Sequence, residues 1–323
     1  MNSTTMVRST IEHRVSEVQP RTPGRAPRRG RRTPLLLLAP AAVVLTALIV
    51  VPVGFLAFTS FTDFDQRSLF TGEFDLVGFD QYVAILRDPE FWAAALRTLY
   101  FTGAMVVGSV VVGVATAQLM TRLRSWMRTA LTIALVLAWA MPTVASSQVW
   151  LWLFQPGFGV VNWLITRLRV FGDVTDVNWA QSSGLALVCI WLLIVWQAVP
   201  LIALTVYAAQ TQVNPEYLEA ARLDGATEWR IYWQVVLPFL RPTIMVMTVL
   251  STIWDFNVFN QIWLISQGGP GHATTTLGIY TYQRAFVGFD IGNGAAIAIV
   301  TTVLLIILSA FYVRSLLRSG EDL

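Results

Sequence analysis

Residues 185–209 read LALVCIWLLIVWQAVPLIALTVYAA, and no charged side chain interrupts them. A helix needs about 20 predominantly apolar residues to cross the hydrocarbon core of a bilayer. Because that core offers the backbone no hydrogen-bond partners, only helices and closed barrels can span it. This run is continuous, whereas a barrel strand alternates apolar and polar residues over about ten positions. The stretch therefore predicts a membrane-spanning helix in an all-α membrane protein.

Five more apolar runs accompany this one, and the composition of the chain agrees with them. Of 323 residues, 55% are hydrophobic and 13% are charged, whereas a soluble domain carries about 25% charged residues. We therefore expect six transmembrane helices, at residues 34–57, 99–120, 130–154, 185–209, 242–265 and 292–312.

The first run could alternatively belong to a signal peptide, because arginines precede it and Ala39 and Ala41 form an Ala-x-Ala pattern. The apolar region of a signal peptide spans about 7–15 residues, and its small-residue cleavage site follows that region. Here the run is longer and the pattern stands near its beginning. Both features favour a retained transmembrane helix.

The arginines predict the orientation of the six spans. With the N-terminus inside, sixteen of the 22 basic residues lie in inside segments, and six lie outside together with ten acids. Short cytoplasmic loops of membrane proteins are enriched in basic residues. We therefore expect both termini in the cytoplasm, with the inside segments at 1–33, 121–129, 210–241 and 313–323.

The expected organisation follows from these spans. Residues 1–33 are rich in Arg, Pro, Ser and Thr, which is typical of a disordered tail. Such a basic tail could bind nucleic acid, but its topological signal accounts for it, so we expect membrane lipid and no nucleic acid as partners. The remaining parts are the first span at 34–57, an external loop at 58–98, a membrane core at 99–316 and a cytoplasmic tail at 317–323.

The scarcity of reactive side chains excludes several kinds of enzyme. All 22 basic residues are arginine, so the chain has no lysine for a phosphate-binding loop or a Schiff base. One cysteine and two histidines, without supporting neighbours, make a metal site or a catalytic triad implausible. We expect no catalytic residue, no metal and no cofactor bound by this chain.

The cytoplasmic segment 213–238 carries signals of two short helices. Asn214-Pro215 is a typical helix start, Gly225 permits a break, and Thr227 can cap a second helix. Leu237-Pro238 is expected to end that helix. The pair could pack on the bilayer as interfacial helices, or it could be a docking site for a cytoplasmic partner. The residue pattern by itself leaves both interpretations open.

The same segment resembles a known family. The run EAARLDGA at 219–226, followed by VVLP at 235–238, is similar to the EAA motif of ABC-importer permeases. Other stretches resemble the carbohydrate branch of that family, the maltose and glycerol-3-phosphate type, and the resemblance extends over residues 35–316. These stretches are LVGFDQY at 76–82, DPEFW at 88–92, LFQPGFGVVN at 153–162, QGGP at 267–270 and TTT at 274–276.

The resemblance implies a type I ABC-importer permease (MetI-like) fold in a bacterial plasma membrane. It implies ATP-driven sugar import, with ATP and Mg used by two separate ATPase subunits. A second permease subunit and an extracytoplasmic sugar-binding protein complete the expected complex. Through the EAA element, the resemblance places the ATPase-coupling site at Glu219, Ala220, Ala221, Asp224 and Gly225.

A substrate site is expected near the middle of the membrane. Asp255 is the one acid within the six expected spans, and leaving it in lipid would cost about 2.5 kcal/mol or more. Ser251 lies one helical turn before it on the same face. The resemblance places substrate contacts at Trp139, Thr143, Gln197, Ala198, Leu201, Ser251, Asp255 and Val258.

Two of these positions depart from a maltose-type site. Asp255 is acidic where a neutral amide is expected, and Val258 is apolar where a polar residue is expected. The substrate is therefore expected to differ from maltose, and each of these residues could also make ordinary contacts between helices. Asn257 and Asn260 extend the polar patch toward the outer end of the span.

Three other functions remain open. The chain could be a permease for a non-sugar solute, or a proton-coupled secondary transporter that uses Asp255. A single buried acid without a visible inverted repeat argues against proton coupling. It could also be a membrane scaffold or receptor without transport, which an intact EAA element argues against.

Overall fold

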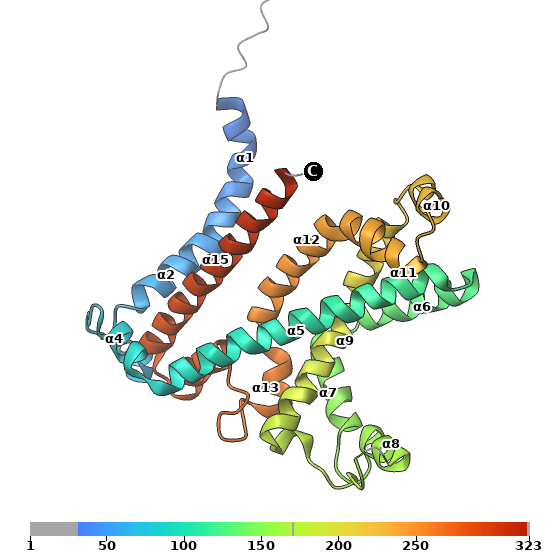
Figure 1. Ribbon diagram of the computed structural model, residues 1–323. Coiled ribbons are helices and arrows are strands. Elements are labelled where there is room, and N and C mark those ends of the chain that lie inside the picture. Colours follow the sequence, from blue (N-terminus) through green and yellow to red (C-terminus); the bar gives the residue numbers. More distant parts are fainter. Residues whose placement is uncertain (1–31, 170, 322–323) are drawn as a thin grey trace, which may run out of the picture. The chain divides into compact units, whose positions relative to one another are not determined.

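The computed structural model describes residues 32–169 and 171–321 (Figure 1). The chain divides into two compact units, residues 1–53 and 54–323. Most of the expected disordered tail, 1–33, lies outside the described residues. The first unit contains α1 (Arg32–Leu45), a π-helical turn (Thr46–Val50) and the beginning of α2 (Val51–Thr59). Residues 38–59 are long and apolar enough to span a membrane.

Two short helices precede the core of the second unit. They are α3 (Gln66–Thr71), which begins with a capping box between Asp65 and Ser68, and α4 (Asp80–Arg87). Asp88 then caps α5 (Pro89–Arg122) by accepting a hydrogen bond from the backbone N–H of Glu90. The second span therefore begins ten residues earlier than residue 99, where the apolar run alone placed it.

The central packing of the second unit joins α5 to α9 (Ser183–Gln210). Glycine lets the two backbones approach, because a Cβ at Gly113 would lie 2.6 Å from the Ile202 side chain. The Trp191 indole N–H of α9 donates to the backbone carbonyl of Ala104 at 2.8 Å. Buried Met105, Ile190 and other apolar side chains fill the core around this contact.

The third expected span is bent instead of straight. It consists of α6 (Ser125–Trp139) and α7 (Thr143–Leu153), which meet at 103°. Pro142 explains the break, because the residue before a proline disfavours helical backbone and proline donates no N–H. The expectation of one unbroken helix at 130–154 is therefore wrong. Beyond α7 follow α8 (Val160–Leu168) and a 3₁₀ turn (Trp179–Gln181).

The fifth span differs from expectation at both ends. α10 (Pro215–Leu223) and α11 (Glu228–Ile231) form the expected cytoplasmic pair. However, α11 continues through a π-helical turn (Tyr232–Val236) into α12 (Leu237–Phe256), so Leu237-Pro238 does not end the helix. The π-helical turn accommodates Pro238 without a break in the helix. Local adjustments of this kind let proline occur within membrane helices. The helix also stops at Phe256 instead of 265.

Shorter elements connect α12 to the last helix. They are α13 (Asn260–Ser266), α14 (Leu277–Tyr282) and a π-helical turn (Gln283–Val287), and α15 (Ile291–Glu321) is the last helix. The described residues contain five helices suited to cross a membrane, or six when the bent pair α6–α7 counts as one. The expected all-α, six-span architecture is confirmed.

Candidate transport cavity and coupling surface

A cavity of about 360 Å³ lies between α6, α7, α9 and α12, at the points where two helices break. Its volume falls in the lower part of the 300–1,000 Å³ range of small-molecule sites. All eight positions expected to contact substrate line it together: Trp139, Thr143, Gln197, Ala198, Leu201, Ser251, Asp255 and Val258.

The helix breaks account for this gathering. The bend after α6 brings Trp139, at the end of one helix, and Thr143, at the start of the next, to the same wall. The end of α12 at Phe256 allows Val258 to turn toward the cavity. Gln197 lies in the middle of the uninterrupted α9, opposite these breaks.

A chain of polar side chains crosses the cavity wall. The Gln197 amide donates to the Ser146 hydroxyl at 2.7 Å and accepts from the Gln261 amide at 2.9 Å. These bonds orient Gln197 from both sides. Three helices, α7, α9 and α13, are thereby tied together at the cavity.

Asp255 contributes a carboxyl group that is nearly removed from solvent. The residue is 6% exposed, Ser251 one turn earlier is 5% exposed, and both line the cavity. The Asp255 Oδ2 atom is buried without a hydrogen-bond partner in the described part of the chain. A buried acceptor without a partner costs about 1–3 kcal/mol. This oxygen can therefore accept a hydrogen bond from any donor that enters the cavity.

Aromatic faces surround this acid. Trp139 and Trp254 are 57% and 55% exposed and line the cavity, as does Phe259. Aromatic rings and a few oriented polar groups are the usual composition of a site for a small organic molecule. Trp254, Phe259 and Gln261 also line the cavity and were missed from the sequence, although Trp254 lies three residues after Ser251, at helical spacing on the same side.

The second candidate site is the helix pair α10–α11, which the sequence predicts on the cytoplasmic side. Asn214 caps α10 by accepting from the Glu216 N–H at 3.1 Å, and Thr227 caps α11. Gly225 between them has φ +79°, a left-handed conformation that favours glycine. The expected caps and the expected glycine break are all confirmed.

The surface of α10 is open to a partner. None of its residues is buried, and Leu223 at its end is 89% exposed. The expected coupling residues Glu219, Ala220, Asp224 and Gly225 are exposed, whereas Ala221 is half-buried and packs against the core. An ion pair joins the two helices, with the Arg222 Nε atom 2.8 Å from the Glu228 carboxylate. The pair is thus held as one unit.

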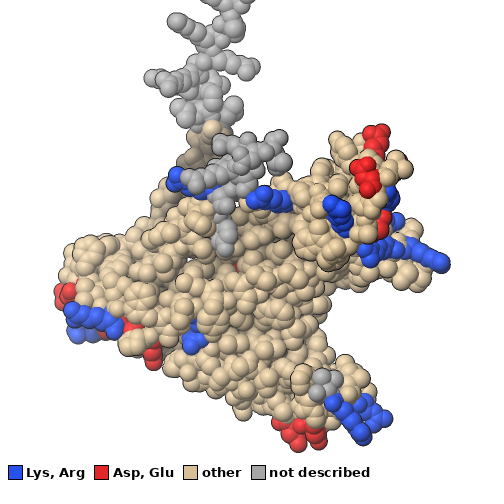
Figure 2. All heavy atoms as spheres, in the orientation of Figure 1, with Lys and Arg blue, Asp and Glu red and all other residues tan. Residues whose placement is uncertain are grey.

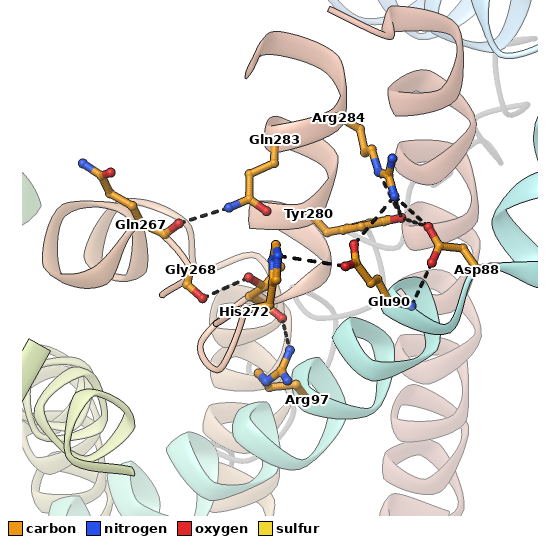
Figure 3. Close-up of polar contacts among 10 residues, drawn as sticks. Asp88, Glu90, Arg97, Gln267, Gly268, His272, Tyr280, Gln283 and Arg284 are labelled. Carbon is orange, nitrogen blue, oxygen red and sulfur yellow. Dashed lines mark hydrogen bonds and ion pairs between the residues drawn. The ribbon is translucent and has the colours of Figure 1, made fainter. Parts of the chain in front are cut away.

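A third polar cluster lies at the N-terminal end of α5 (Figure 3). The Tyr280 hydroxyl donates to Asp88 Oδ2 at 2.5 Å, and Arg284 approaches the same oxygen at 2.7 Å. Arg284 also lies 3.7 Å from the Glu90 carboxylate, which is 3.9 Å from His272. We call Asp88, Glu90, Tyr280 and Arg284 the external clamp, because it fastens the start of α5 to α14 and the turn after it.

Electrostatics within the external clamp follow from these contacts. Burial by itself would raise the pKa of Asp88, but hydrogen bonds from Tyr280 and the Glu90 backbone, with the charge of Arg284, hold it below its usual value. Burial and the hydrogen bond to Asp88 raise the pKa of Tyr280 to about 12. Near neutral pH, Asp88 is therefore a carboxylate and Tyr280 a neutral donor.

Arg97 adds a bond to the loop between α13 and α14. Its guanidinium donates to the backbone carbonyl of Thr275 at 2.7 Å, and the Thr98 hydroxyl accepts from the Leu277 N–H. Within the described residues, no three His, Cys, Asp or Glu side chains gather to hold a metal ion.

A helical bundle with several spans, a central polar cavity and an exposed helix pair outside the membrane defines a polytopic membrane transport protein. The chain belongs to the family described as "Binding-protein-dependent transport system inner membrane component", which matches residues 109–319. It is thus a multi-pass component of the inner membrane, as the resemblance implied.

Individual relatives cover nearly the whole chain. It is 40% identical to the diacetylchitobiose uptake system permease protein DasB of Streptomyces coelicolor, over 92% of this chain and 90% of that one. It is 34% identical to the sulfoquinovosyl glycerol transport system permease protein SmoG of Agrobacterium fabrum, over 87% of this chain and 89% of that one. A solved bacterial ABC transporter involved in alginate import shares the fold, with a TM-score of 0.74 at 20% identity. The match covers 88% of this chain and 94% of that one.

Proposed function

We propose that this chain is the membrane-spanning permease subunit of an ATP-driven importer for a sugar. The names of its relatives support a sugar, because the two described above are permeases for diacetylchitobiose and sulfoquinovosyl glycerol. The main structural support is the cavity. It is lined by all eight positions at which the resemblance implies contact with substrate.

The chemistry of the cavity suits a sugar ring. The exposed indole of Trp139 offers an apolar face on which the C–H face of a pyranose can stack. Gln197 and Asp255 offer acceptors and a donor for hydroxyl or amide groups around the ring. The acid at 255 and the apolar Val258 favour a substrate that differs from maltose in its hydrogen-bond donors.

ATP would be hydrolysed by partner subunits in this proposal. The chain contains no lysine, so it lacks the lysine of a phosphate-binding loop. The exposed α10, with Glu219, Asp224 and Gly225, is the surface on which an ATPase subunit would dock. ATP and Mg would be bound by those subunits and not by this chain.

The proposed complex contains a second permease, two ATPase subunits and an extracytoplasmic binding protein. Both termini lie in the cytoplasm, which agrees with the distribution of the arginines. The binding protein delivers sugar from the opposite side, where α3, α4, α8 and the external clamp lie. Transport proceeds by alternating access, so the cavity faces one side of the membrane at a time.

The test reconstitutes the whole complex in nanodiscs and measures its ATPase activity with a panel of neutral, acetamido, phosphorylated and sulfonated sugars. One sugar should raise the activity of the wild type several-fold. Glu219→Ala with Gly225→Pro should abolish that stimulation, whereas Glu73→Ala, which removes an exposed acid from the external loop, should not. Thermal unfolding of the variants shows whether they are folded, and Glu219→Ala alone replaces the double variant if it is not.

Two results would overturn the proposal. If no ATPase co-purifies with the chain, the docking role of α10 is wrong. If the ATPase assembles but no sugar changes its activity or enters proteoliposomes, the substrate class is wrong. Proton flux that depends on Asp255 would then support a secondary transporter instead.

A further inference from the structure

Helix α8 has an inverted distribution of polar and apolar side chains. A helix on the surface of a protein in water normally buries its apolar stripe and exposes its polar face. In α8 the polar side chains of Asn162 and Thr166 are turned inward, whereas most of the exposed side chains are apolar. This arrangement requires an apolar environment outside the helix.

The inner face is fastened by Asn162. This side chain is 1% exposed, donates to the backbone carbonyl of Val177 at 3.0 Å and accepts from the Trp179 indole at 2.6 Å. One turn later, the Thr166 hydroxyl accepts from the Val174 N–H at 3.0 Å. These bonds fix the rotation of α8 about its axis, so the opposite face cannot turn inward.

The outer face is apolar and uncovered. Trp163 and Leu168 are 61% and 63% exposed, and Val160 and Leu164 share their face at helical spacing. Phe158 before the helix and Phe171 after it are 74% and 78% exposed. Exposed apolar patches of this kind mark surfaces that contact a membrane or a protein.

Two arginines adjoin this face. Arg167 lies among its apolar residues, and Arg169 ends the helix in a left-handed conformation with φ 54°. Neither makes an ion pair in the part of the chain that the structure describes. With Trp163, Thr166 and Thr175 they line a shallow depression. The nearby Asp173 is engaged in its own turn, where it accepts from the Thr175 N–H at 3.0 Å.

Helix α8 lies in the connection between two segments that are suited to cross a membrane. It begins seven residues after the end of α7 at Leu153 and precedes the start of α9 at Ser183, and both helices belong to spanning segments. Figure 1 shows α8 lying crosswise to α7 and α9. In Figure 2, charged side chains appear at the end of the molecule where α8 lies, next to a broad surface without charged side chains.

We infer that α8 is an interfacial helix whose outer face enters the lipid and whose Arg167 and Arg169 hold the phosphate of an anionic phospholipid. Tryptophan and arginine side by side, with aliphatic residues between them, are typical of helices at the headgroup level. The aliphatic stem of Arg167 lies along the apolar face while its guanidinium reaches the headgroups. The free positive charges favour an anionic lipid over a zwitterionic one.

A spin label tests the position of the outer face. The chain has one cysteine, Cys189, so a Cys189→Ser background accepts a single label at Leu164→Cys or, as a control in the external loop, at Glu73→Cys. The full complex is placed in nanodiscs of phosphatidylcholine with and without phosphatidylglycerol. The label at 164 should be at least threefold less accessible to a water-soluble nickel chelate than the label at 73, and more accessible to oxygen.

The charge of the site is tested by Arg167→Gln with Arg169→Gln, against Arg167→Lys with Arg169→Lys. Native mass spectrometry counts phosphatidylglycerol molecules retained by each purified complex. The Gln variant should retain fewer than the wild type, and the Lys variant should retain most of them.

Three outcomes would overturn the inference. Equal nickel access at 164 and 73 means that the face is in water. Protection that appears only when the binding protein is added means that the face docks a protein. Unchanged phosphatidylglycerol retention in the Gln variant means that the arginines do not hold the lipid.

Discussion

Two carboxyl groups, Asp88 in the external clamp and Asp255 in the cavity, have opposite surroundings. Asp88 receives hydrogen bonds from Tyr280, from the Glu90 backbone and from Arg284. Asp255 is 6% exposed, and its Oδ2 has no partner among the described residues. A fully satisfied acid stabilises a structure, whereas a buried acid with a free oxygen costs stability, and we propose that Asp255 is retained to bind substrate. The comparison separates polar groups that hold the fold from polar groups that are available to substrate.

Asp255→Asn is the substitution with the largest expected effect, and it tests whether Asp255 serves substrate and not the fold. We expect sugar-stimulated transport to fall about 5- to 150-fold, since exchanging an acceptor oxygen for an N–H donor mismatches a buried hydrogen bond worth about 1–3 kcal/mol. The melting temperature should stay the same or rise, because a costly buried carboxyl group is removed. Uptake of sugar into proteoliposomes and thermal unfolding of the purified complex measure the two effects.

A large fall in melting temperature without loss of transport per folded complex would contradict this expectation. It would mean that Asp255 has a structural partner in the assembled importer.

The second test removes the cation of the external clamp. Arg284→Ala leaves Asp88 and Glu90 beside one another without their positive partner. We expect a loss of about 1 kcal/mol in unfolding free energy, because Arg284 is 41% exposed and water screens part of the interaction. Transport per folded complex should be retained, and thermal unfolding in detergent measures the change.

Arg67→Ala is the matched control for Arg284→Ala. Arg67 also pairs with an acid on the external side, but both side chains of that pair are 77% exposed. We expect a change within about 0.5 kcal/mol. Equal effects of the two substitutions would show that the external clamp adds nothing to an ordinary surface ion pair.

The smallest expected effect is the pH dependence of the external clamp. The pKa of Asp88 is lower in the fold than its usual value of 3.8, so its contribution to stability is fully present above that value. The contribution is lost as the pH falls through the lower pKa of the folded state. The difference in melting temperature between wild type and Asp88→Asn should therefore shrink below about pH 4, and a constant difference would contradict the assignment.

The sequence predicted the cavity better than it predicted the external clamp, for a physical reason. Ser251 and Asp255 share a face because they lie one helical turn apart, which a local pattern reveals. The other six expected positions came from the resemblance to the family and from no local pattern. Asp88 and Arg284 are separated by 196 residues, and no local pattern brings such residues together. The membrane spans were visible from apolar runs for the same local reason.

The breaks in the helices were the main failure of sequence reasoning. Pro142 lay within an apolar run, and the run by itself did not show that the chain would turn by 103° there. Pro238 gave the opposite error, because a π-helical turn carried the helix past it. Whether a proline bends or merely adjusts a membrane helix depends on the neighbours that satisfy the freed backbone groups.

The helix that Pro238 fails to interrupt runs from Glu228 to Phe256. Glu228 is bound to Arg222 of the cytoplasmic pair, and Asp255 lies at the other end, about 40 Å away along the helix axis. Thermodynamic linkage is reciprocal, so a partner on α10 that changes the affinity of the cavity must have its own affinity changed by the same factor when sugar binds. If α10 docks the ATPase as proposed, sugar in the cavity would change the affinity of that docking through this single helix, before any ATP is hydrolysed.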